Sequence, residues 1–516
     1  MSEVSGPTDS VFPLRAAAID IGSNAMRFVA VEFLDPTRWN VLEQVRSPVR
    51  LGRGAFAARR LADDAIEAAV QTLAGYARLL ETRDIAHYRA VATSAVRESR
   101  NQDVFLSRAA AEAGIEVEPI TGTEEARLVH LAVAGRIDMM RGRWLLADLG
   151  GGSVEVSLVD SETIHWSVSH DMGSVRMLEE LSMAGDDTRH FQRRLEEYTA
   201  TLRLPRRSRV KGFAATGGNI EALARLADAP VDASGVSVLR LRALHAIIDR
   251  LGGMTAEERV RDLDLREDRA DVILPAAMVY ERLCMMAGFD EIHVPGVGVK
   301  EGVLLDLADD LSQHGRHGVR QDQQVYHSAI ALGRRYRFDQ PHARHVTKLA
   351  LILFDELHSL HGLDGADRRL LMAAAILHDI GGFIGYRKHH KHSLYLISQA
   401  ELPGVSTADM RIVANVGRYH RKSEPAQHHE EFMALGERAR DRVTRLAALL
   451  RIADALDREH AQNVTRLTAT DDGETVTLTV QGRGDMLLEQ WAVEKKCGLF
   501  EKVFSRSIRV LAGSGA

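Results

Sequence analysis

The amino-acid sequence predicts an α/β core made of two similar lobes, followed by an α-helical domain and a small mixed C-terminal unit. A unit of strand, glycine-rich turn and strand occurs near the amino terminus and recurs 128 residues later, measured from Asp20 to Asp148. From about Gln321 the apolar spacing changes to that of long amphipathic helices, and strand-like alternation returns after about Asn463. The predicted domains are therefore residues 1–136, 137–312, 320–462 and 463–516.

Length and composition describe a globular protein with several hydrophobic cores. A chain of 516 residues exceeds the size that one core usually supports, and 45% hydrophobic with 27% charged residues argues against a disordered or fibrous protein. The net charge of -6 does not favour general nucleic-acid binding, although a local basic channel can still hold a polyanion.

Cysteine usage and hydropathy indicate the compartment. The two cysteines, Cys284 and Cys497, lie far apart, which excludes a disulfide framework and favours a reducing environment. Residues 1–15 lack the basic and apolar pattern of a leader, and no apolar run approaches the length of a membrane span. We therefore expect a cytoplasmic protein with no membrane partner.

The first lobe opens with a strand at Ala16–Ile21, the turn DIGSN at Asp20–Asn24, and a second strand at Met26–Phe33. Small residues in this turn let backbone N–H groups approach a phosphate, while the Asp20 carboxylate can hold a metal ion or its water. The rest of the lobe alternates helix and strand, with elements predicted at Leu61–Leu80, Tyr88–Ala92 and Gln102–Ala113.

The second lobe repeats this opening. An apolar strand and glycines at Arg143–Gly152 lead into the motif DLGGGSVE, which ends at Glu155, and a strand follows at Val154–Val159. A third loop, ATGGN at Ala215–Asn219, follows an apolar run and opens a helix, so its amides can receive an anion. A tight turn would explain one such loop, but three of them favour a phosphate-bearing ligand held between two lobes.

The C-terminal half begins after a predicted linker at Asp309–Asp322, which is polar and contains glycines. The helical domain that follows concentrates its histidines between His342 and His460. Alternation at Val464–Val480 and around Val503–Val510 predicts strands in the small C-terminal unit, for which the sequence indicates no function.

Several motifs together identify a family. They are AAIDIGSNAMRF, ATSAVRE at Ala92–Glu98, ITGTEEARL at Ile120–Leu128, LLADLGGGSVEV, ATGGN, and VPGVGVKEGVLLD at Val294–Asp306. With these motifs the chain resembles the exopolyphosphatase and guanosine pentaphosphate phosphatase family, within the actin-like ATPase superfamily, over most of its length. The resemblance implies two actin-like, ribonuclease H-like lobes that face a cleft and, by analogy, a homodimer.

The resemblance also implies the chemistry, which is metal-dependent removal of the terminal phosphoryl group of inorganic polyphosphate. By position in the motif it places the catalytic carboxylate at Glu125 in preference to Glu124. Adjacent helical residues point about 100° apart, so only one of the two is expected to face the cleft. Glu125 would orient and deprotonate the attacking water. Mg²⁺ or Mn²⁺ would be held by Asp148 and Glu155, with Asp20 as a further ligand. The implied phosphate-binding residues are Ser23, Asn24, Arg97, Gly151, Gly152, Ser153, Gly217, Gly218 and Asn219.

The helical region resembles an HD-type domain. His345, the pair His378 and Asp379 in LHDIG, and Asp454 in RIADALD are metal-ligand types in the order of that domain, and the occupancy of this second site is left open. Basic residues crowd neighbouring motifs and suit contact with a long polyphosphate, although a solvated basic face is the alternative. They are Arg387, Lys388, Lys391, Arg418, Arg421 and Lys422.

Three other functions compete with an exopolyphosphatase. A guanosine pentaphosphate 5'-phosphohydrolase has the same fold and chemistry, but a small nucleotide gains nothing from an extended basic channel. A non-catalytic polyphosphate or nucleotide sensor would need the carboxylates but not their productive geometry, and the retained Glu125, Asp148 and Glu155 count against it. The third alternative assigns the main phosphohydrolase activity to the HD-type region.

Overall fold

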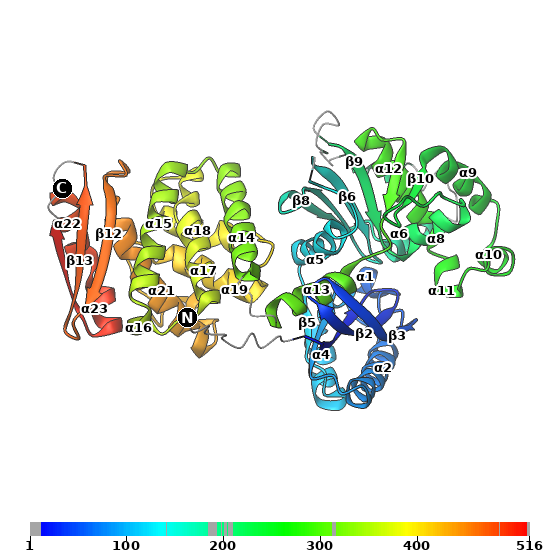
Figure 1. The fold of residues 1–516 in the computed structure, drawn as a ribbon, viewed down its shortest axis with the longest axis horizontal. Coiled ribbons are helices and arrows are strands. Elements are labelled where there is room, and N and C mark those ends of the chain that lie inside the picture. Colours follow the sequence, from blue (N-terminus) through cyan, green and yellow to red (C-terminus); the bar gives the residue numbers. More distant parts are fainter. Residues whose placement is uncertain are drawn as a thin grey trace, which may run out of the picture. The chain divides into compact units, whose positions relative to one another are not determined.

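The computed structural model describes residues 12–140, 142–183, 210–311, 316–483 and 486–512, with isolated positions between 193 and 204. The chain divides into two compact units, Met1–His317 and Gly318–Ala516 (Figure 1). In the described part of the chain, no helix is long and apolar enough to cross a membrane. Most of the segment 1–15, for which no leader is predicted, lies outside the described residues.

The first lobe of unit 1 is built on a five-stranded sheet with the order β3-β2-β1-β4-β5. β1, β2 and β3 are antiparallel neighbours, whereas β4 and β5 continue the sheet in parallel from β1. Helices α2 and α4 cover one face, where Leu73 and Phe105 join Ile19 and Phe28 in one apolar cluster. The elements are β1 Leu14–Ile21, β2 Met26–Asp35, β3 Arg38–Ser47, α1 Ala55–Ala58, α2 Asp63–Thr82, β4 His87–Ala92, α3 Ser94–Arg97, α4 Gln102–Ala113 and β5 Val117–Pro119.

The structure confirms each helix and strand that the sequence predicts in this lobe, within a few residues. The sequence did not indicate β3, because this strand lies at the sheet edge and none of its side chains is fully buried. An edge strand of this kind lacks the apolar alternation that marks a half-buried strand.

The second lobe carries a six-stranded sheet with the order β10-β11-β9-β6-β7-β8, and its core includes helices α8, α9 and α12. The described elements are β6 Trp144–Leu149, β7 Val154–Val159, β8 Ile164–His170, α6 Ser174–Met183, β9 Gly212–Thr216, α8 Gly218–Leu226, β10 Ser237–Arg240, α9 Leu241–Gly252, α10 Ala256–Leu263, α11 Glu267–Ala270, α12 Ile273–Ala287 and β11 Glu291–Val294.

The two lobes repeat the same hairpin, as predicted, down to the hydrogen bond that closes its turn. In the β1–β2 hairpin Asp20 pairs with Arg27, and in the β6–β7 hairpin Asp148 pairs with Glu155. Both turns close in the same way, since Gly22 N donates to Ala25 O over 3.2 Å and Gly150 N donates to Ser153 O over 3.0 Å. At equivalent positions, the hairpin of the first lobe therefore carries an acidic and a basic side chain, and the hairpin of the second lobe carries two acidic side chains.

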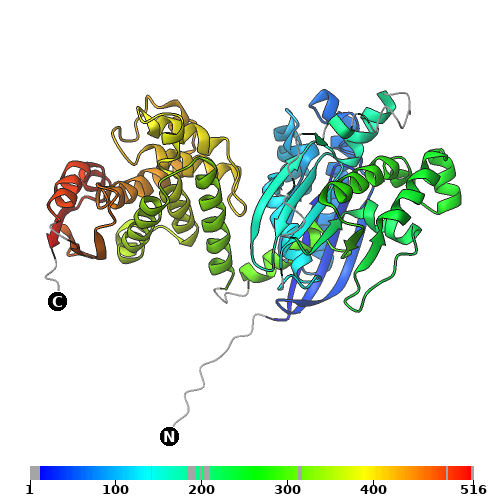
Figure 2. The same cartoon turned by 90° about the horizontal axis from the view of Figure 1, so that it is seen from above.

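Helices α5 (Gly122–Ala134) and α13 (Val299–Leu311) stand between the two sheets (Figures 1 and 2). One apolar cluster contains Leu128 of α5, Val303 of α13, Ala18 of β1 and Leu146 of β6. The helices approach so closely that a Cβ atom at Gly302 would lie 2.0 Å from the carbonyl oxygen of Leu128. Because a backbone oxygen cannot move aside as a flexible side chain can, only glycine fits at position 302.

This packing alters the predicted division of unit 1. The sequence places 137–312 in the second lobe, but α13 packs on α5 and on β1 of the first lobe. The chain thus returns to the first lobe after completing the second, which an order of elements read along the sequence does not reveal.

Unit 2 is a helical bundle with a three-stranded sheet of order β12-β13-β14 (Figure 1). Its elements are α14 Arg316–Arg335, α15 Gln340–Glu356, α16 His358–His361, α17 Gly365–Leu377, the 3-10 helix Ile380–Phe383, α18 His389–Ser398, α19 Thr407–Arg418, α20 Glu430–Met433, α21 Glu437–Ala455, β12 Val464–Asp471, β13 Thr475–Gly482, α22 Leu487–Lys496, α23 Gly498–Phe504 and β14 Ser507–Ala512.

Two predictions for this half differ from the structure. Leu450 of α21 and Val480 of β13 belong to one apolar cluster, so residues 463–516 share the core of the helical bundle. The predicted linker Asp309–Asp322 is largely helical, because α13 extends to Leu311 and α14 begins at Arg316. Its central residues, 312–315, lie outside the described residues.

Candidate active site

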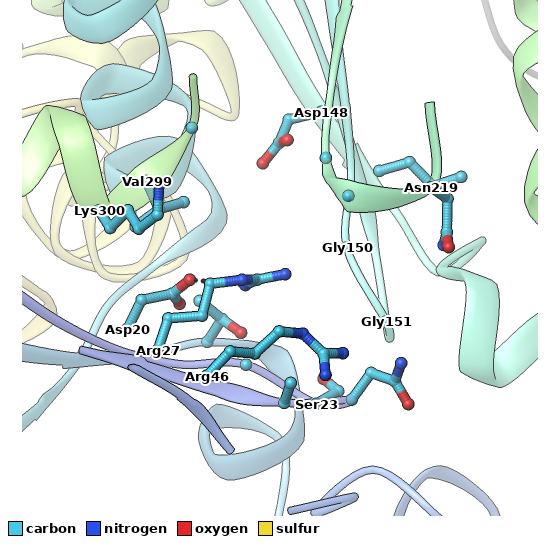
Figure 3. A pocket seen from close by; sticks show the side chains of 18 of the residues that line it. Asp20, Ser23, Arg27, Arg46, Asp148, Gly150, Gly151, Asn219, Val299 and Lys300 are labelled. Carbon is cyan, nitrogen blue, oxygen red and sulfur yellow. Dashed lines mark hydrogen bonds and ion pairs between the residues drawn. The ribbon is translucent and has the colours of Figure 1, made fainter. Parts of the chain in front are cut away.

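A cavity of about 410 Å³ lies between the lobes of unit 1, at the ends of β1, β6 and β9. Asp20, Arg27 and Arg46 from the first lobe face Asp148 and Asn219 from the second (Figure 3). All three predicted glycine loops reach this cavity, and the predicted residues among its lining are Asp20, Ser23, Asn24, Glu125, Asp148, Gly151, Gly217, Gly218 and Asn219.

Some glycines of these loops serve packing as well as ligand access. Gly217 has a φ of +110°, and a Cβ atom there would lie 2.8 Å from the Leu149 carbonyl oxygen. A Cβ at Gly152 would lie 2.3 Å from the Phe56 ring, so this glycine lets the two lobes meet. Gly152 and Ser153, which the resemblance assigns to phosphate binding, are not among the residues that line the cavity.

Three buried carboxylates converge beside the cavity, and Glu125 and Asp148 line it. Asp148 and Glu155 lie opposite each other on β6 and β7, and Glu125 comes from the first turn of α5. One ligand oxygen from each of the three lies within 4.8 Å of the others. The hydrogen bonds that they accept include those from Thr216 Oγ1 to Asp148 Oδ1 over 2.6 Å, Ser169 Oγ to Glu155 Oε1 over 2.8 Å and Arg97 Nη1 to Glu125 Oε2 over 3.4 Å.

The carboxylate oxygens of this group suit a divalent cation. Among the described atoms, Glu155 Oε2 is buried and has no hydrogen-bond partner, and carboxylate oxygens are the ligands that Mg²⁺ prefers. Three acceptor groups that share so few donors are poorly satisfied by the protein alone. A cation held by Asp148 and Glu155, next to Glu125, would compensate their charge.

Burial and mutual repulsion raise the pKa values of this group. Burial raises the pKa of Asp148 to about 6, and the neighbouring Asp20 adds to the shift. Burial and the charge of Asp148 raise the pKa of Glu155 to about 7. Burial and the charge of Glu155 raise the pKa of Glu125 well above its ordinary value. A bound cation would reverse these shifts, since it favours the ionised carboxylates.

Asp20 is paired with an arginine. Its Oδ2 accepts a hydrogen bond from Arg27 Nη1 over 2.8 Å, and it does not belong to the group of three described carboxylates whose ligand oxygens lie within 4.8 Å of one another. Its role as a further metal ligand stays a prediction.

The two adjacent glutamates of α5 point in different directions, as predicted. Glu124 is held by Arg127, whose Nη2 lies 2.8 Å from its Oε1, and this pair belongs to the brace between α5 and α13. Glu125 lines the cavity. Arg97, which the resemblance places on substrate phosphates, donates to Ile120 O over 2.8 Å and lies 3.4 Å from Glu125 Oε2. It is not among the residues that line the cavity.

Sequence reasoning missed the cations of the cavity. Arg27, Arg46, Arg266, Arg269 and Lys300 all line it. Burial, together with the charges of Arg266 and Arg46, lowers the pKa of Arg269 to about 10. Arg27 and Lys300 lie within motifs quoted above, so the sequence could have indicated them as cavity residues. No local pattern marks Arg46 or Arg266, which reach the cavity only through the fold.

At the second predicted metal site, the structure differs from the prediction in one residue. In unit 2, His378 Nε2 lies 3.7 Å from Asp454 Oδ1 and 3.8 Å from Asp379 Oδ2. The histidine of α15 that joins them is His342, whose Nε2 is 3.3 Å from His378 Nε2. His345 is half-buried, and among the described atoms its Nε2 has no hydrogen-bond partner. The predicted Arg387, Lys388 and Lys391 are exposed.

Comparisons with known proteins match both halves of the chain. The pattern of the Ppx/GppA phosphatase family matches residues 34–311, which is more than half of the chain. The chain belongs to the Ppx/GppA phosphatase family. The pattern of Ppx/GppA phosphatase domain III matches residues 326–494, which include the helical bundle and part of the C-terminal sheet.

Relatives within the Ppx/GppA family carry two different names. The chain is 26% identical to a guanosine-5'-triphosphate,3'-diphosphate pyrophosphatase of Vibrio vulnificus, over 90% of this chain and 92% of the relative. It is 33% identical to exopolyphosphatase 2 of Mycobacterium tuberculosis, over 57% of this chain and 98% of the relative. A crystal structure of an exopolyphosphatase-like protein covers 58% of this chain and 98% of its own, with 24% identity and a TM-score of 0.52, which supports the actin-like fold.

The raised pKa values predict a pH-dependent metal site. Below pH 6 to 7, Asp148 and Glu155 retain protons that a cation must displace. We expect the affinity for Mg²⁺ to fall as the pH is lowered from 8 to 5.5, by about tenfold per pH unit for each proton displaced. Isothermal titration calorimetry at several pH values measures this. Glu155→Gln should bind Mg²⁺ more weakly and with a shallower pH dependence, whereas an affinity that is constant over this range in the wild type would contradict the assignment.

Proposed function

We propose that this Ppx/GppA phosphatase is an exopolyphosphatase, which hydrolyses the terminal phosphoryl group of inorganic polyphosphate and releases orthophosphate. The observation that carries the proposal is the meeting of buried carboxylates and several cations at one cavity. Glu125 and Asp148 line it with Glu155 close by, and arginines and Lys300 line it as well. A polyanion needs the cations for binding, and its hydrolysis needs the carboxylates for metal binding and proton transfer.

Glu125 is the proposed general base. It is buried, lines the cavity and has a carboxylate oxygen within 4.8 Å of those of Asp148 and Glu155, so a proton acceptor stands beside the proposed metal ligands. In the reaction a water oxygen forms a bond to the terminal phosphorus, and Glu125 takes the water proton. The bond between that phosphorus and the bridging oxygen breaks, which leaves a chain one phosphoryl group shorter.

Asp148 and Glu155 are the proposed ligands of Mg²⁺ or Mn²⁺. When bound, this cation neutralises charge on the phosphoryl oxygens. Asp20 orients Arg27 through their ion pair of 2.8 Å, which keeps that guanidinium at the cavity for phosphate binding. Backbone amides and side chains of Ser23, Asn24 and Gly217–Asn219 form the rest of the proposed phosphate cradle.

Hydrolysis of guanosine pentaphosphate is the second candidate function. The Vibrio vulnificus relative that carries the pyrophosphatase name covers 90% of this chain, and the same cavity chemistry would serve either substrate. Exposed Arg387, Lys388 and Lys391 in unit 2 support polyphosphate, because a long chain gains from cations beyond the cavity. A cytoplasmic location, a homodimer and an HD-like nature of unit 2 remain predictions.

Substitution of the proposed base tests the reaction. Glu125→Gln preserves size and removes the proton acceptor, so we expect kcat for orthophosphate release from polyphosphate to fall by about a hundredfold or more, while the protein stays folded. Glu124→Gln is the matched control. Its glutamate belongs to the ion pairs around Arg127, so the expected effect is a lower melting temperature and little change in kcat of the folded protein. Wild-type turnover in Glu125→Gln would refute the role of this residue.

The same assay decides between the two substrates. We expect a higher kcat/KM for polyphosphate than for guanosine pentaphosphate in the wild type. The reverse order would assign the chain to the second candidate function while leaving the role of Glu125 intact.

The exposed cations of unit 2 predict an effect of chain length. Replacing Arg387, Lys388 and Lys391 by alanine should weaken binding of long polyphosphate far more than that of short oligophosphates, because only a long chain reaches beyond the cavity. Its affinity should also depend less steeply on salt, since fewer phosphate contacts are made. A control that replaces exposed Arg458, Arg466 and Arg509 removes the same charge and should leave the length dependence unchanged. Equal losses on short and long substrates would contradict the proposal.

A further inference from the structure

A second cluster of metal-ligand side chains lies in unit 2, apart from the cavity described above. Its members come from α15, α18 and α21, from the end of α17 and from the residues after α19. Two groups of ligand atoms each lie within 4.8 Å, and both groups contain Asp379. The first adds His342 and His378, and the second adds His389 and His420. All four histidines are buried.

The hydrogen bonds of the outer ring nitrogens fix how these histidines face the cluster. His378 Nδ1 donates to Ala375 O over 2.8 Å, His389 Nδ1 to Tyr386 O over 3.1 Å, and His420 Nδ1 to Gly417 O over 2.6 Å. A carbonyl oxygen only accepts, so Nδ1 carries the proton and each neutral ring directs the lone pair of Nε2 inwards. Metal-binding histidines are held in this way, by a hydrogen bond from the nitrogen that does not bind the metal.

His342 is held differently and to the same effect. Its Nδ1 lies 2.8 Å from Asp457 Oδ2, and both side chains are buried. A carboxylate that accepts from the outer nitrogen orients the ring and makes the inner nitrogen a better ligand. Asp457 thus supports His342 without belonging to the cluster itself.

The carboxylate of Asp379 lies between the two groups. Its Oδ1 is 3.0 Å from His389 Nε2 and 3.3 Å from His420 Nε2, while its Oδ2 faces His378 Nε2 at 3.8 Å. His389 Nε2 and His420 Nε2 are themselves only 3.3 Å apart. Protonation of both rings would place two buried imidazolium groups side by side, which is costly. A cation accounts for two converging lone pairs and a carboxylate oxygen with no such cost.

We propose that unit 2 holds two transition-metal ions bridged by Asp379, and that this centre binds a phosphate group of a phosphorylated ligand. Four protein groups bind the first ion, namely His342, His378, Asp379 and Asp454, whose Oδ1 lies 3.6 Å and 3.7 Å from the two histidine nitrogens. Three bind the second, namely Asp379, His389 and His420. The proposal does not rest on the proposed function of unit 1.

The ligand chemistry selects the cation and the anion. Imidazole nitrogens favour Fe or Zn over Mg²⁺ and Ca²⁺, which prefer oxygen ligands, and the carboxylates of the cluster also suit Mn²⁺. Three protein ligands on the second ion leave positions for oxygen atoms from water or phosphate. Arg421 Nη1 lies 3.4 Å from His389 Nε2, so a guanidinium stands beside that ion to pair with a phosphate oxygen.

Metal analysis of the full chain tests the centre. Protein loaded with Mn²⁺ and freed of excess by gel filtration is measured by mass spectrometry. Relative to wild type, we expect Asp379→Asn to lose about two equivalents, His420→Gln about one and His345→Gln none. His345→Gln is a matched control, because this histidine lies on the same helix as His342 but outside the cluster. Equal manganese contents in all four proteins would overturn the proposal.

Electron paramagnetic resonance adds a measurement that a purely structural role would not change. Wild-type protein loaded with Mn²⁺ should show an exchange-coupled pair, and His420→Gln should show isolated ions. Inorganic phosphate should alter the wild-type spectrum and have less effect in Arg421→Ala. Glu125→Gln should retain the coupled signal, so loss of the proposed activity in unit 1 is distinguishable from failure of this centre. Isolated ions in the wild type would refute the pair, and a spectrum that phosphate leaves unchanged would refute the anion site.

Discussion

The packing of α5 against α13 between the two sheets is the constraint on which the rest of unit 1 depends. Gly302 leaves no room for a side chain above Leu128, and the buried Arg127 bridges Glu124 to Asp306 across the two helices. Removal of one member of such a buried pair typically costs about 3 to 5 kcal/mol. Because Glu125 follows Glu124 on α5 and Lys300 opens α13, the contact that closes the core also sets a carboxylate and an ammonium group at the cavity.

The cavity concentrates charge that the fold alone does not neutralise. Burial and neighbouring carboxylates raise the pKa values of Glu125, Asp148 and Glu155, and burial beside other arginines lowers the pKa of Arg269 to about 10. Strongly shifted groups that converge in a cleft mark functional sites, since a stable core would avoid them. A cation at the carboxylates and a polyanion at the arginines would relieve both kinds of repulsion, which links metal binding to substrate binding.

Sequence patterns predicted what is encoded locally. The hairpins at Asp20 and Asp148 were recognisable because a strand, an acid and small residues stand together in the chain. Helical spacing predicted that Glu124 and Glu125 point apart, and the family resemblance selected Glu125. Contacts between distant segments were not predictable. Position 152 requires glycine because the Phe56 ring packs against it, and Asp20 forms an ion pair with Arg27. His342 and His345 lie three residues apart on one helix, and only the packing of the bundle selects the buried one.

The central claim is that Glu125, Asp148 and Glu155 form one metal and proton-transfer site at the terminal phosphate. A crystal structure of the protein with Mn²⁺ and a non-hydrolysable imido analogue of tripolyphosphate tests it most directly. The account predicts an anomalous scattering peak bound by Asp148 and Glu155, with a water between the Glu125 carboxylate and the terminal phosphorus. An analogue bound in unit 1 with no cation at these carboxylates, or with its terminal phosphorus out of reach of Glu125, would contradict it.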